Sequence, residues 1–512
     1  MKLELKGITK RFPGVIANDH VDLTVQPGEI HALLGENGAG KTTLMNILYG
    51  LYRADEGEVL IDEGPVHFDS PRDAIAAGLG MVHQHFMLVP VFTVTENIIL
   101  GVETTGPFGL LHLNEASRRV KDISRRYGLE VPPDAVVEDL PVGIQQRAEI
   151  VKALYREAEV LILDEPTAVL TPQETEELFD VMRSLRDAGT SIVFITHKLK
   201  EVLAIADTIT VLRRGQVVGT TTPAEISEEE LATMMVGRAV HLTVAKAPAE
   251  PAATVLVVED LVVEDDRRQV AVNDVSFEVR AGEIVCIAGV QGNGQTELAE
   301  ALTGLRGIRS GRVHILGRNV TKASPKEVLR TGVAHVPEDR LRDGVIVDFS
   351  IADNLVLNTY DLPPFARWIV RDEGEVVRAA EERARAFDIR TPSVLQPVST
   401  LSGGNQQKTI VAREFSRESR LIIASQPTRG LDVGSVEYIH SRLVEQRDRG
   451  AAVLIVSVEL DAVMGLADRI AVMFRGRIVD VLPADRANRE ELGLMMAGAA
   501  GAFTEAQSTA DG

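Results

Sequence analysis

Apolar positions in this chain gather into short runs that alternate with longer amphipathic segments. Val160 to Leu163 and Ser191 to Thr196 are rich in β-branched and other apolar residues, a composition typical of strands covered on both faces of a sheet. Between these runs, residues 172–188 place apolar side chains at helical spacing, with acidic residues early and arginines late, which suits the helix dipole. Strands that alternate with helices predict an α/β fold.

A second pattern covers about residues 95–158, which are predicted to be mainly helical. This region separates a glycine-rich stretch near residue 40 from the strand that begins at Val160. We therefore expect a helical subdomain beside the α/β core.

The same order of elements occurs a second time, about 255–260 residues further along the chain. Corresponding segments are 21–30 and 275–284, 140–146 and 401–407, and 163–167 and 424–428. Such self-similarity predicts a tandem duplication of one domain. We place the domains at residues 1–240 and 254–497. Residues 241–253, which lack an apolar period, are predicted to be a linker, and residues 498–512, which are small and polar, a disordered tail.

Composition narrows the class of protein. The chain has 512 residues, 45% of them hydrophobic, and a formal net charge of −21, which argues against a nucleic-acid partner because such proteins present a basic face. Its one cysteine, Cys286, allows no disulfide within the chain and favours a reducing compartment. The start of the sequence shows no signal-peptide pattern, and no apolar run approaches the length of a membrane span. We expect a soluble protein whose membrane role, if any, comes through a partner.

A glycine-rich stretch lies between a predicted buried strand, residues 29–34, and a predicted helix, residues 44–48. It consists of Gly35, Glu36, Asn37, Gly38, Ala39, Gly40, Lys41, Thr42 and Thr43. This stretch fits the P-loop pattern, in which backbone amides and a helix N-terminus surround phosphate oxygens. Lys41 can then reach the β- and γ-phosphates, and the Thr42 hydroxyl can bind Mg²⁺. An ordinary glycine-rich turn is the alternative, but the flanking strand and helix favour nucleotide binding.

Two adjacent carboxylates, Asp164 and Glu165, end one of the buried strands. Burying such a pair is costly unless it meets a metal ion or a substrate. We interpret Asp164 as a contact to Mg²⁺ through water, and Glu165 as the base that activates the attacking water. A solvated strand end is the alternative, which the upstream P-loop disfavours. His197 could contact the γ-phosphate or be structural, and Gln84 could sense Mg²⁺ and water or simply end a strand.

These residues, together with Leu401-Ser402-Gly403-Gly404-Asn405-Gln406-Gln407, resemble the ATP-binding subunits of ABC transporters. The resemblance spans about residues 5–495 and implies two tandem P-loop NTPase domains of the ABC type, each with a mixed-sheet α/β core and a helical subdomain. More narrowly, the chain resembles the tandem ATPase subunits of simple-sugar and nucleoside importers. Residues 82–90 and 424–432 favour the nucleoside branch over monosaccharide importers of the ribose and galactose type.

The resemblance implies composite sites, each ATP lying between the P-loop of one domain and the Leu-Ser-Gly-Gly signature of the other. Site one would combine Phe12, residues 35–43, Gln84, Asp164, Glu165 and His197 of the first domain with Ser402, Gly403, Gly404 and Asp432 of the second. In this site the Phe12 ring meets adenine, while Thr42, Gln84 and Asp164 hold Mg²⁺. Glu165, His197 and Gln84 are the catalytic residues that the resemblance implies.

Site two would be defective in its chemical groups, although Gly292, Gly294 and Thr296 preserve part of the phosphate cradle. It has Gln295 for the lysine, Arg267 for the aromatic residue, Glu338 for the glutamine, Ser425 and Gln426 for the acidic pair and Val458 for the histidine. The facing signature has Pro141 for serine and Val142 for the first glycine, and Thr171 replaces the aspartate that follows the acidic strand. The substitutions fall on one composite site, although each domain contributes to both. Because loss of a general base alone costs about 10²–10⁴ in rate, we expect one hydrolytic site and a second that retains only part of its phosphate cradle.

The resemblance implies an ATPase that couples hydrolysis of Mg²⁺-bound ATP to import. Its expected partners are two transmembrane permease subunits and, indirectly, an extracytoplasmic solute-binding protein, with the chain peripheral at the cytoplasmic face of the membrane. Residues of about 85–100 and 339–355 are expected to dock permease loops. The alternative from another class is a soluble tandem ABC ATPase acting on ribosomes or DNA, which the defective site and the weakly basic linker disfavour.

Overall fold

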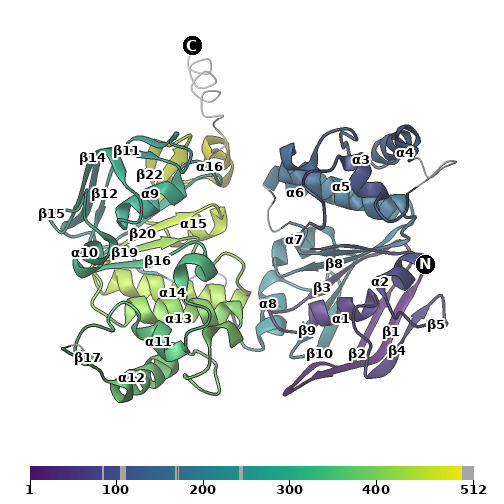
Figure 1. Ribbon diagram of the computed structural model, residues 1–512, viewed down its shortest axis with the longest axis horizontal. Coiled ribbons are helices and arrows are strands. Elements are labelled where there is room, and N and C mark those ends of the chain that lie inside the picture. The colour runs from purple at the N-terminus through teal and green to yellow at the C-terminus, as the bar shows by residue number, and fades with distance from the viewer. Residues whose placement is uncertain are drawn as a thin grey trace, which may run out of the picture. The chain divides into compact units, whose positions relative to one another are not determined.

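The computed structural model describes residues 1–83, 86–103, 111–167, 170, 172–240, 246–368, 370–496 and 498. Its chain divides into two compact units, one formed by Met1–Val240 with Asp432–Gly434 and the other by His241–Leu431 with Ser435–Gly512 (Figure 1). Both units combine two sheets with flanking helices, so the predicted α/β class is confirmed for each. Among the described residues, no helix combines the length and apolar character needed to cross a membrane.

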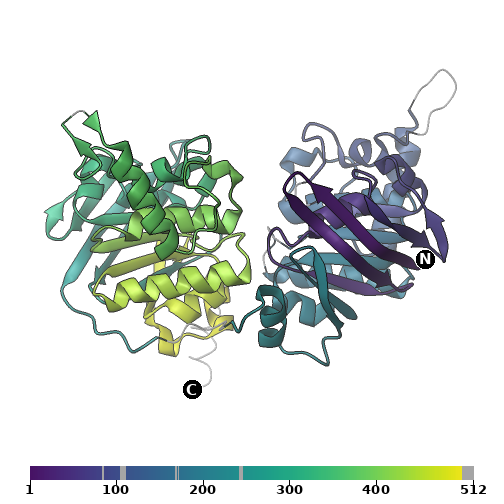
Figure 2. The ribbon, with the colours of Figure 1, turned by 90° about the horizontal axis from the view of Figure 1, so that it is seen from below.

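The first unit begins with an antiparallel sheet of four strands in the order β2-β1-β4-β5. These strands are β1 (Leu3–Phe12), β2 (Val15–Val25), β4 (Glu56–Ile61) and β5 (Gly64–Val66). Apolar side chains on one face, such as Leu3, Leu5 and Ile8, are fully or almost fully buried. Figure 2 shows the long strands of this sheet side by side in purple.

A second sheet of six strands forms the centre of the first unit, in the order β10-β9-β3-β8-β7-β6. Its strands are β3 (Ile30–Leu34), β6 (Leu79–Val82), β7 (Val160–Asp164), β8 (Ser191–Thr196), β9 (Thr208–Arg213) and β10 (Gln216–Thr221). All neighbours are parallel except β10, which is antiparallel to β9. Because parallel strands end at the same edge of a sheet, the residues that follow β3, β7 and β8 come together there.

Helices cover these sheets and form the predicted helical subdomain. They are α1 (Lys41–Leu48), α2 (Pro71–Ala76), α3 (Val94–Ile99), α4 (Leu113–Arg126), α5 (Val142–Tyr155), α6 (Pro172–Asp187), α7 (Leu199–Ile205) and α8 (Glu228–Val236), with a 3₁₀ turn at Val137–Asp139. Helices α3, α4 and α5 pack on one another, at the end of the unit away from β1, β2 and β4 (Figure 1). Helix α3 starts with a capping box between Thr93 and Glu96, which satisfies two otherwise unpaired amides.

The second unit repeats this architecture. Its four-stranded sheet has the order β12-β11-β14-β15, and its six-stranded sheet the order β16-β19-β20-β13-β21-β22, which matches the first unit read from β6 to β10. The strands are β11 (Thr254–Glu264), β12 (Val270–Arg280), β13 (Ile284–Ala288), β14 (Ile308–Ile315), β15 (Arg318–Asn319), β16 (Val333–Val336), β19 (Leu421–Ser425), β20 (Ala452–Ser457), β21 (Arg469–Phe474) and β22 (Arg477–Pro483), with a small hairpin of β17 (Ala366–Arg367) and β18 (Val370–Arg371). The predicted duplication is therefore confirmed at the level of sheet topology.

Helices of the second unit follow the same order. They are α9 (Gln295–Leu302), α10 (Pro325–Arg330), α11 (Ile351–Val356), α12 (Glu373–Ala386), α13 (Gly403–Phe415), α14 (Val433–Asp448), α15 (Leu460–Leu466) and α16 (Arg489–Met496), with short turns at Arg340–Gly344, Val398–Thr400 and Ala484–Arg486. Helices α11, α12 and α13 pack together as the counterpart of α3, α4 and α5.

Apolar packing fixes the loops at the strand ends. Leu33 of β3 and Leu44, Met45 and Leu48 of α1 are fully buried in one cluster beneath the first glycine-rich loop. Each such side chain stabilises the fold by about 1.5–3 kcal/mol relative to an exposed position. In the second unit Ile287, Leu298 and Leu302 belong to the equivalent cluster. The loops between strand and helix are therefore attached to rigid elements at both ends.

Candidate functional site

The glycine-rich loop of the first unit joins β3 to α1, as the sequence predicts. Gly40 has φ of 104°, and a Cβ there would lie 2.2 Å from the carbonyl oxygen of Ala17. A Cβ on Gly35 would lie 2.4 Å from the oxygen of Leu212. Only glycine fits these two positions, since other residues would be strained or would clash. The loop therefore brings its backbone amides close to any group at the N-terminus of α1.

Lys41 lies at the centre of this loop. Its Nζ donates to the carbonyl oxygens of Gly35 at 2.6 Å and Glu36 at 3.0 Å, and the residue is 6% exposed. Burial lowers the pKa of Lys41, while the nearby carboxylates of Glu165 and Asp164 oppose that shift. A buried cation between loop carbonyls and two acids is suited to receive phosphate oxygens. Next to it, Thr42 is exposed at the first turn of α1, where its hydroxyl is open to a metal ion.

The acidic pair stands at the same edge of the sheet. Asp164 is the last residue of β7, and the Glu165 amide donates to the carbonyl oxygen of Ile195 on β8 at 2.9 Å. Glu165 has φ of 47°, which turns the chain sharply after the strand. Its Oε1 lies 2.9 Å from Nδ1 of His197, the residue directly after β8. The predicted neighbours Glu165 and His197 are thus in hydrogen-bond contact.

The two carboxyl groups titrate differently. Burial, reinforced by the Glu165 charge, raises the pKa of Asp164 to about 6. Burial also acts on Glu165, but the hydrogen bond and charge of His197, with Lys41 and Lys198, hold its pKa below the usual value. Glu165 is therefore ionised and oriented near neutral pH, as a base must be. Asp164 would gain most from a cation, because a metal ion would offset its desolvation.

These residues fit Mg²⁺. Mg²⁺ usually takes one or two protein ligands and completes its shell with phosphate oxygens and water. Thr42 and Asp164 supply such a partial set at the edge of the P-loop. No cluster of three or more His, Cys, Asp or Glu within the described ranges is arranged to hold a metal by itself. Gln84, the third predicted ligand, lies outside the described residues.

An exposed aromatic ring lies beside the loop. Phe12 ends β1 and is 37% exposed. Its ring packs edge-on against Tyr52 with centroids 5.5 Å apart. The β1–β2 hairpin that carries it also contacts the P-loop, because Asn18 Nδ2 donates to the Gly40 oxygen at 3.2 Å. Sequence reasoning missed Asn18 and Tyr52; neither belongs to a motif, and only tertiary structure brings Asn18 to Gly40 and Tyr52 to Phe12.

The predicted signature residues lie at a helix N-terminus in the second unit. Ser402 is the N-cap of α13, and its Oγ accepts from Asn405 Nδ2 at 3.1 Å. Gly403 and Gly404 form the first turn, whose amides point out along the helix axis. Asp432 directly precedes α14. In the first unit Pro141 caps α5 at the matching position, and Val142 is 44% exposed there. Thr171 lies outside the described residues.

The second P-loop has the same backbone conformation as the first but lacks its charged side chain. Gly292 and Gly294 have φ of 88° and 96°, close to Gly38 and Gly40 at 81° and 104°. Gln295 begins α9 and is 4% exposed, with its Nε2 buried and lacking a partner among the described residues. Its amide folds back over the loop toward Gly289, as Lys41 folds toward Gly35. The cation of the first loop is replaced by a neutral group.

The hydroxyl that would bind a metal ion in the second loop is already engaged. Thr296 Oγ1 donates to Glu338 Oε2 at 3.0 Å, and Glu338 Oε1 pairs with Arg429 Nη1 at 2.8 Å. The strand-end acid is replaced by Ser425, which is neutral. The Ser425 hydroxyl is buried and has no hydrogen-bond partner among the described residues, but it carries no charge like that of Asp164, and a cation, Arg429, pairs with Glu338 beside the loop. The residues of this loop do not fit Mg²⁺.

Gln426 takes the place of the base without disturbing the backbone. Its φ is 46°, its amide donates to Val456 at 2.8 Å, and its Oε1 accepts from the Val458 amide at 3.3 Å. A carboxamide has no basic carboxylate to offer water. Arg267, aligned with Phe12, lies in the turn between β11 and β12, where its amide donates to Asp265 Oδ1 at 2.9 Å.

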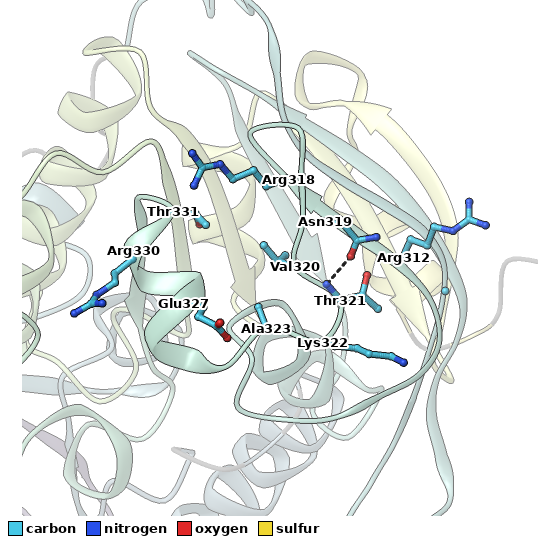
Figure 3. A pocket seen from close by; sticks show the side chains of 11 residues that line it. Arg312, Arg318, Asn319, Val320, Thr321, Lys322, Ala323, Glu327, Arg330 and Thr331 are labelled. Atoms are coloured by element: carbon cyan, nitrogen blue, oxygen red, sulfur yellow. Dashed lines mark hydrogen bonds between the residues drawn. The ribbon is translucent and has the colours of Figure 1, made fainter.

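A surface cavity of about 700 Å³ in the second unit is separate from this loop. It lies beside β14, β15 and α10, and its basic residues are Arg312, Arg318, Lys322 and Arg330. Figure 3 shows these side chains pointing in different directions rather than toward a common centre. The cavity therefore lacks convergent groups and is not a candidate catalytic site.

Comparison with known proteins agrees with this geometry. A family model described as ABC transporter matches residues 18–168 and 272–429, which contain both P-loops. The nucleoside import ATP-binding protein NupA of Lactococcus lactis is 49% identical over 97% of this chain and 98% of that relative. The guanosine import ATP-binding protein NupO of Bacillus subtilis is also 49% identical, over 97% of each chain. The ribose import ATP-binding protein RbsA 1 of Rubrobacter xylanophilus is 44% identical over 97% of this chain and 98% of that relative. The chain belongs to the ABC transporter family, with one ATP-binding domain in each unit.

Proposed function

We propose that this chain is the ATP-hydrolysing, energy-coupling subunit of an importer whose solute is a nucleoside. The observation that carries the ATPase proposal is the Glu165–His197 contact beside an intact P-loop with a buried Lys41. The choice of nucleoside rests on the two nucleoside import relatives at 49% identity over nearly the full chain. Import of a monosaccharide is the second candidate, favoured by the ribose import relative at 44% identity.

Hydrolysis would take place in a composite site. In this proposal Ser402, Gly403 and Gly404 of the second unit close over the γ-phosphate held by the first P-loop. The α13 N-terminus supports such a role, since its free amides and positive dipole end attract an anion. Asp432, just before α14, and the Phe12 ring complete the nucleotide contacts.

Glu165 orients a water molecule and takes its proton as the water oxygen attacks the γ-phosphorus. The bond from phosphorus to the β–γ bridging oxygen breaks, and the electron pair leaves with ADP. His197 holds the carboxylate of Glu165 through Nδ1, and in this proposal it also contacts the γ-phosphate. Lys41 moves from the loop carbonyls to the phosphate oxygens, where it stabilises the developing charge. Thr42, Asp164 and the predicted Gln84 would hold Mg²⁺, which would neutralise part of the phosphate charge.

The second composite site would not hydrolyse ATP. Gln295, Ser425 and Gln426 remove the phosphate cation, the metal acid and the base together. The glycine conformations of the second loop nevertheless resemble those of the first. We therefore propose that nucleotide at this site has a structural role in closure rather than a catalytic one.

Partners follow from the import relatives. Two permease subunits would bind the chain at the cytoplasmic face of the membrane, and an extracytoplasmic solute-binding protein would act through them. Exposed apolar side chains in the expected docking segments support this: Met87 is 61% exposed, Phe92 37% and Phe349 47%. Ile351 is fully buried and belongs to the core instead.

Co-purification decides between transport and the soluble class of ABC ATPase. Tagged protein from native membranes should carry two permease subunits, and vesicles containing the complex should take up labelled nucleoside when ATP is supplied on the side of this chain. Uptake of ribose but not nucleoside would favour the sugar alternative. Recovery of ribosomal material or DNA without permease would contradict transport.

A further inference from the structure

One lysine anchors the segment that leads into the second unit. Lys246 Nζ donates to the carbonyl oxygens of Leu466 and Ala467, at 2.8 and 2.5 Å, and to Asp468 Oδ1 at 2.8 Å. An ammonium group has three protons, and three acceptors receive them here. The carbonyls end α15, where the helix dipole favours a cation. The chain thus contains a complete receptor for a lysine side chain.

A buried arginine completes this receptor. Arg447 Nη1 pairs with Asp468 Oδ1 at 3.1 Å, and its Nη2 donates to the Ala247 carbonyl at 2.9 Å. Asp468 also accepts from the Ile284 amide at 2.8 Å, which fixes it at the start of β13. With the segment in place, the side chain of Arg447 is 1% exposed and that of Asp468 12%. The receptor therefore binds the lysine side chain through Asp468 and the carbonyl of the next residue through Arg447.

The first unit contains the same receptor groups. Arg186 Nη1 pairs with Asp207 Oδ1 at 3.3 Å, and Asp207 Oδ2 accepts from the Ile30 amide at 2.8 Å. Ile205 and Ala206 end α7 just before Asp207, as Leu466 and Ala467 end α15. No lysine among the described residues reaches Asp207. The side chains of Arg186 and Asp207 are 30% and 41% exposed, far more than their counterparts.

A cavity of about 840 Å³ opens at this position in the first unit. Asp22, Glu29, Asp187 and Asp207 line it, against one arginine, Arg186. Glu29 is held by His31, whose Nδ1 lies 3.1 Å from its Oε1. The excess of carboxylates attracts a cation, and the C-terminus of α7, directly before the lining residue Asp207, suits an ammonium better than a planar guanidinium.

We propose that this cleft of the first unit binds a lysine carried on an extended protein segment of a partner. The lysine Nζ would bind Asp207 Oδ1 and the carbonyls of Ile205 and Ala206, and the next carbonyl of the segment would accept from Arg186 Nη2. The second unit supplies the precedent, since its own chain fills the matching receptor. Charge complementarity selects a lysine-bearing segment, and the binding is independent of the proposed ATPase function.

A peptide copying residues 242–253 provides the probe, because it contains Lys246 and Ala247, which the duplicate receptor holds. Fluorescein-labelled peptide is titrated with the full-length chain and followed by anisotropy. We expect saturable binding that weakens at least tenfold when the peptide residue Lys246 is replaced by Ala, since a charge-assisted hydrogen bond is lost. Asp207→Asn in the protein should weaken it equally, and Glu381→Gln, a surface charge on α12, should leave it unchanged.

Two further measurements control for folding and for binding of small amines. Asp207→Asn retains an oxygen for the Ile30 amide, and unchanged ATP binding by this variant verifies that it is folded. Spermidine separates a peptide receptor from a site for small amines: it should compete only weakly. Absence of saturable binding, equal binding of the lysine-free peptide, or spermidine binding as tightly as the peptide would overturn the proposal.

Discussion

At the scale of single residues, the two units differ in side-chain chemistry at matching positions while the backbone conformation stays the same. Glu165 and Gln426 have φ of 47° and 46°, and each donates its amide to the neighbouring strand at 2.9 and 2.8 Å. Only the terminal group differs, a carboxylate in one unit and a carboxamide in the other. The difference between the proposed hydrolytic and non-hydrolytic sites therefore lies in side chains and not in the fold.

Glu165→Gln tests the base directly. The substitution keeps the size of the side chain and removes its basicity, so ATP turnover should fall by about 10²–10⁴. Binding of ATP, measured by filter binding or fluorescence, should change by no more than a few fold, because Lys41 and the loop amides remain. Gln426→Glu is the matched control and should not raise turnover. Turnover near the parent value in Glu165→Gln would remove Glu165 from its role.

Gln295→Lys tests whether the missing lysine alone prevents ATP hydrolysis at the second site. The new lysine restores a phosphate cation, but Ser425, Gln426 and the Thr296–Glu338 contact remain. Steady-state turnover should stay within experimental error of the parent. A doubled rate would mean that the second site lacked only its lysine.

At the scale of elements, the strand–loop–helix units could be predicted from the sequence. The P-loop, the acidic strand end of β7 and the helix around residues 172–188 are local patterns, and local patterns fix local structure. Contacts such as Asn18 with Gly40 and Glu338 with Arg429 could not be predicted, because they join segments 22 and 91 residues apart. The contact of Lys246 with Asp468 was also missed, because it joins segments 222 residues apart. The segment around Lys246 also has no apolar period that would predict a packed element.

Of the two P-loop glycines with positive φ, Gly40 and Gly38, only Gly40 lacks room for a Cβ atom. A Cβ at Gly40 would meet the Ala17 oxygen at 2.2 Å, whereas nothing lies within 4 Å of the same atom at Gly38. Both residues have positive φ, so alanine costs about 1 kcal/mol of strain at either position. Gly40→Ala should therefore lower the free energy of unfolding by at least 1 kcal/mol more than Gly38→Ala, measured by urea denaturation. Equal losses would show that the loop relaxes away from the β1–β2 hairpin.

His440 makes α14 sensitive to acid. Burial lowers its pKa to about 4, below the value of about 6.5 in an unfolded chain. The unfolded state therefore binds a proton first as pH falls. The contribution of His440 to the free energy of unfolding is therefore complete above about pH 6.5. It is lost as pH falls toward 4, by at most about 3 kcal/mol, because the unfolded state takes up a proton that the folded state does not.

His440→Leu should make the free energy of unfolding depend less on pH across this interval. Chemical denaturation of the second unit at several pH values measures the slope. His67→Gln, at an exposed histidine, is the control and should leave the slope unchanged. A slope identical to the parent in His440→Leu would show that His440 is already protonated, or accessible to protons, in the folded state.

At the scale of the whole molecule, two domains of one topology carry different chemistry. The proposed phosphate cation, metal ligand and base belong to the first unit, while the Ser402-Gly403-Gly404 turn that is proposed to face them belongs to the second. A single domain therefore cannot supply every residue of the proposed hydrolytic site. The sequence alone indicates this division, because the substitutions fall on one composite set. The contacts of Thr296 with Glu338 and of Glu338 with Arg429 explain why the second loop does not fit Mg²⁺.

Vanadate trapping with 8-azido-ATP labelled at the α-phosphate tests the single competent site most directly. The trapped nucleotide is photo-crosslinked, and the chain is then cut at a protease site placed within residues 241–245. Because the adenine would lie beside Phe12, the label should appear on the fragment of residues 1–240 and should disappear in Glu165→Gln. Vanadate-dependent label on the second fragment, or shared equally between the fragments, would contradict the account.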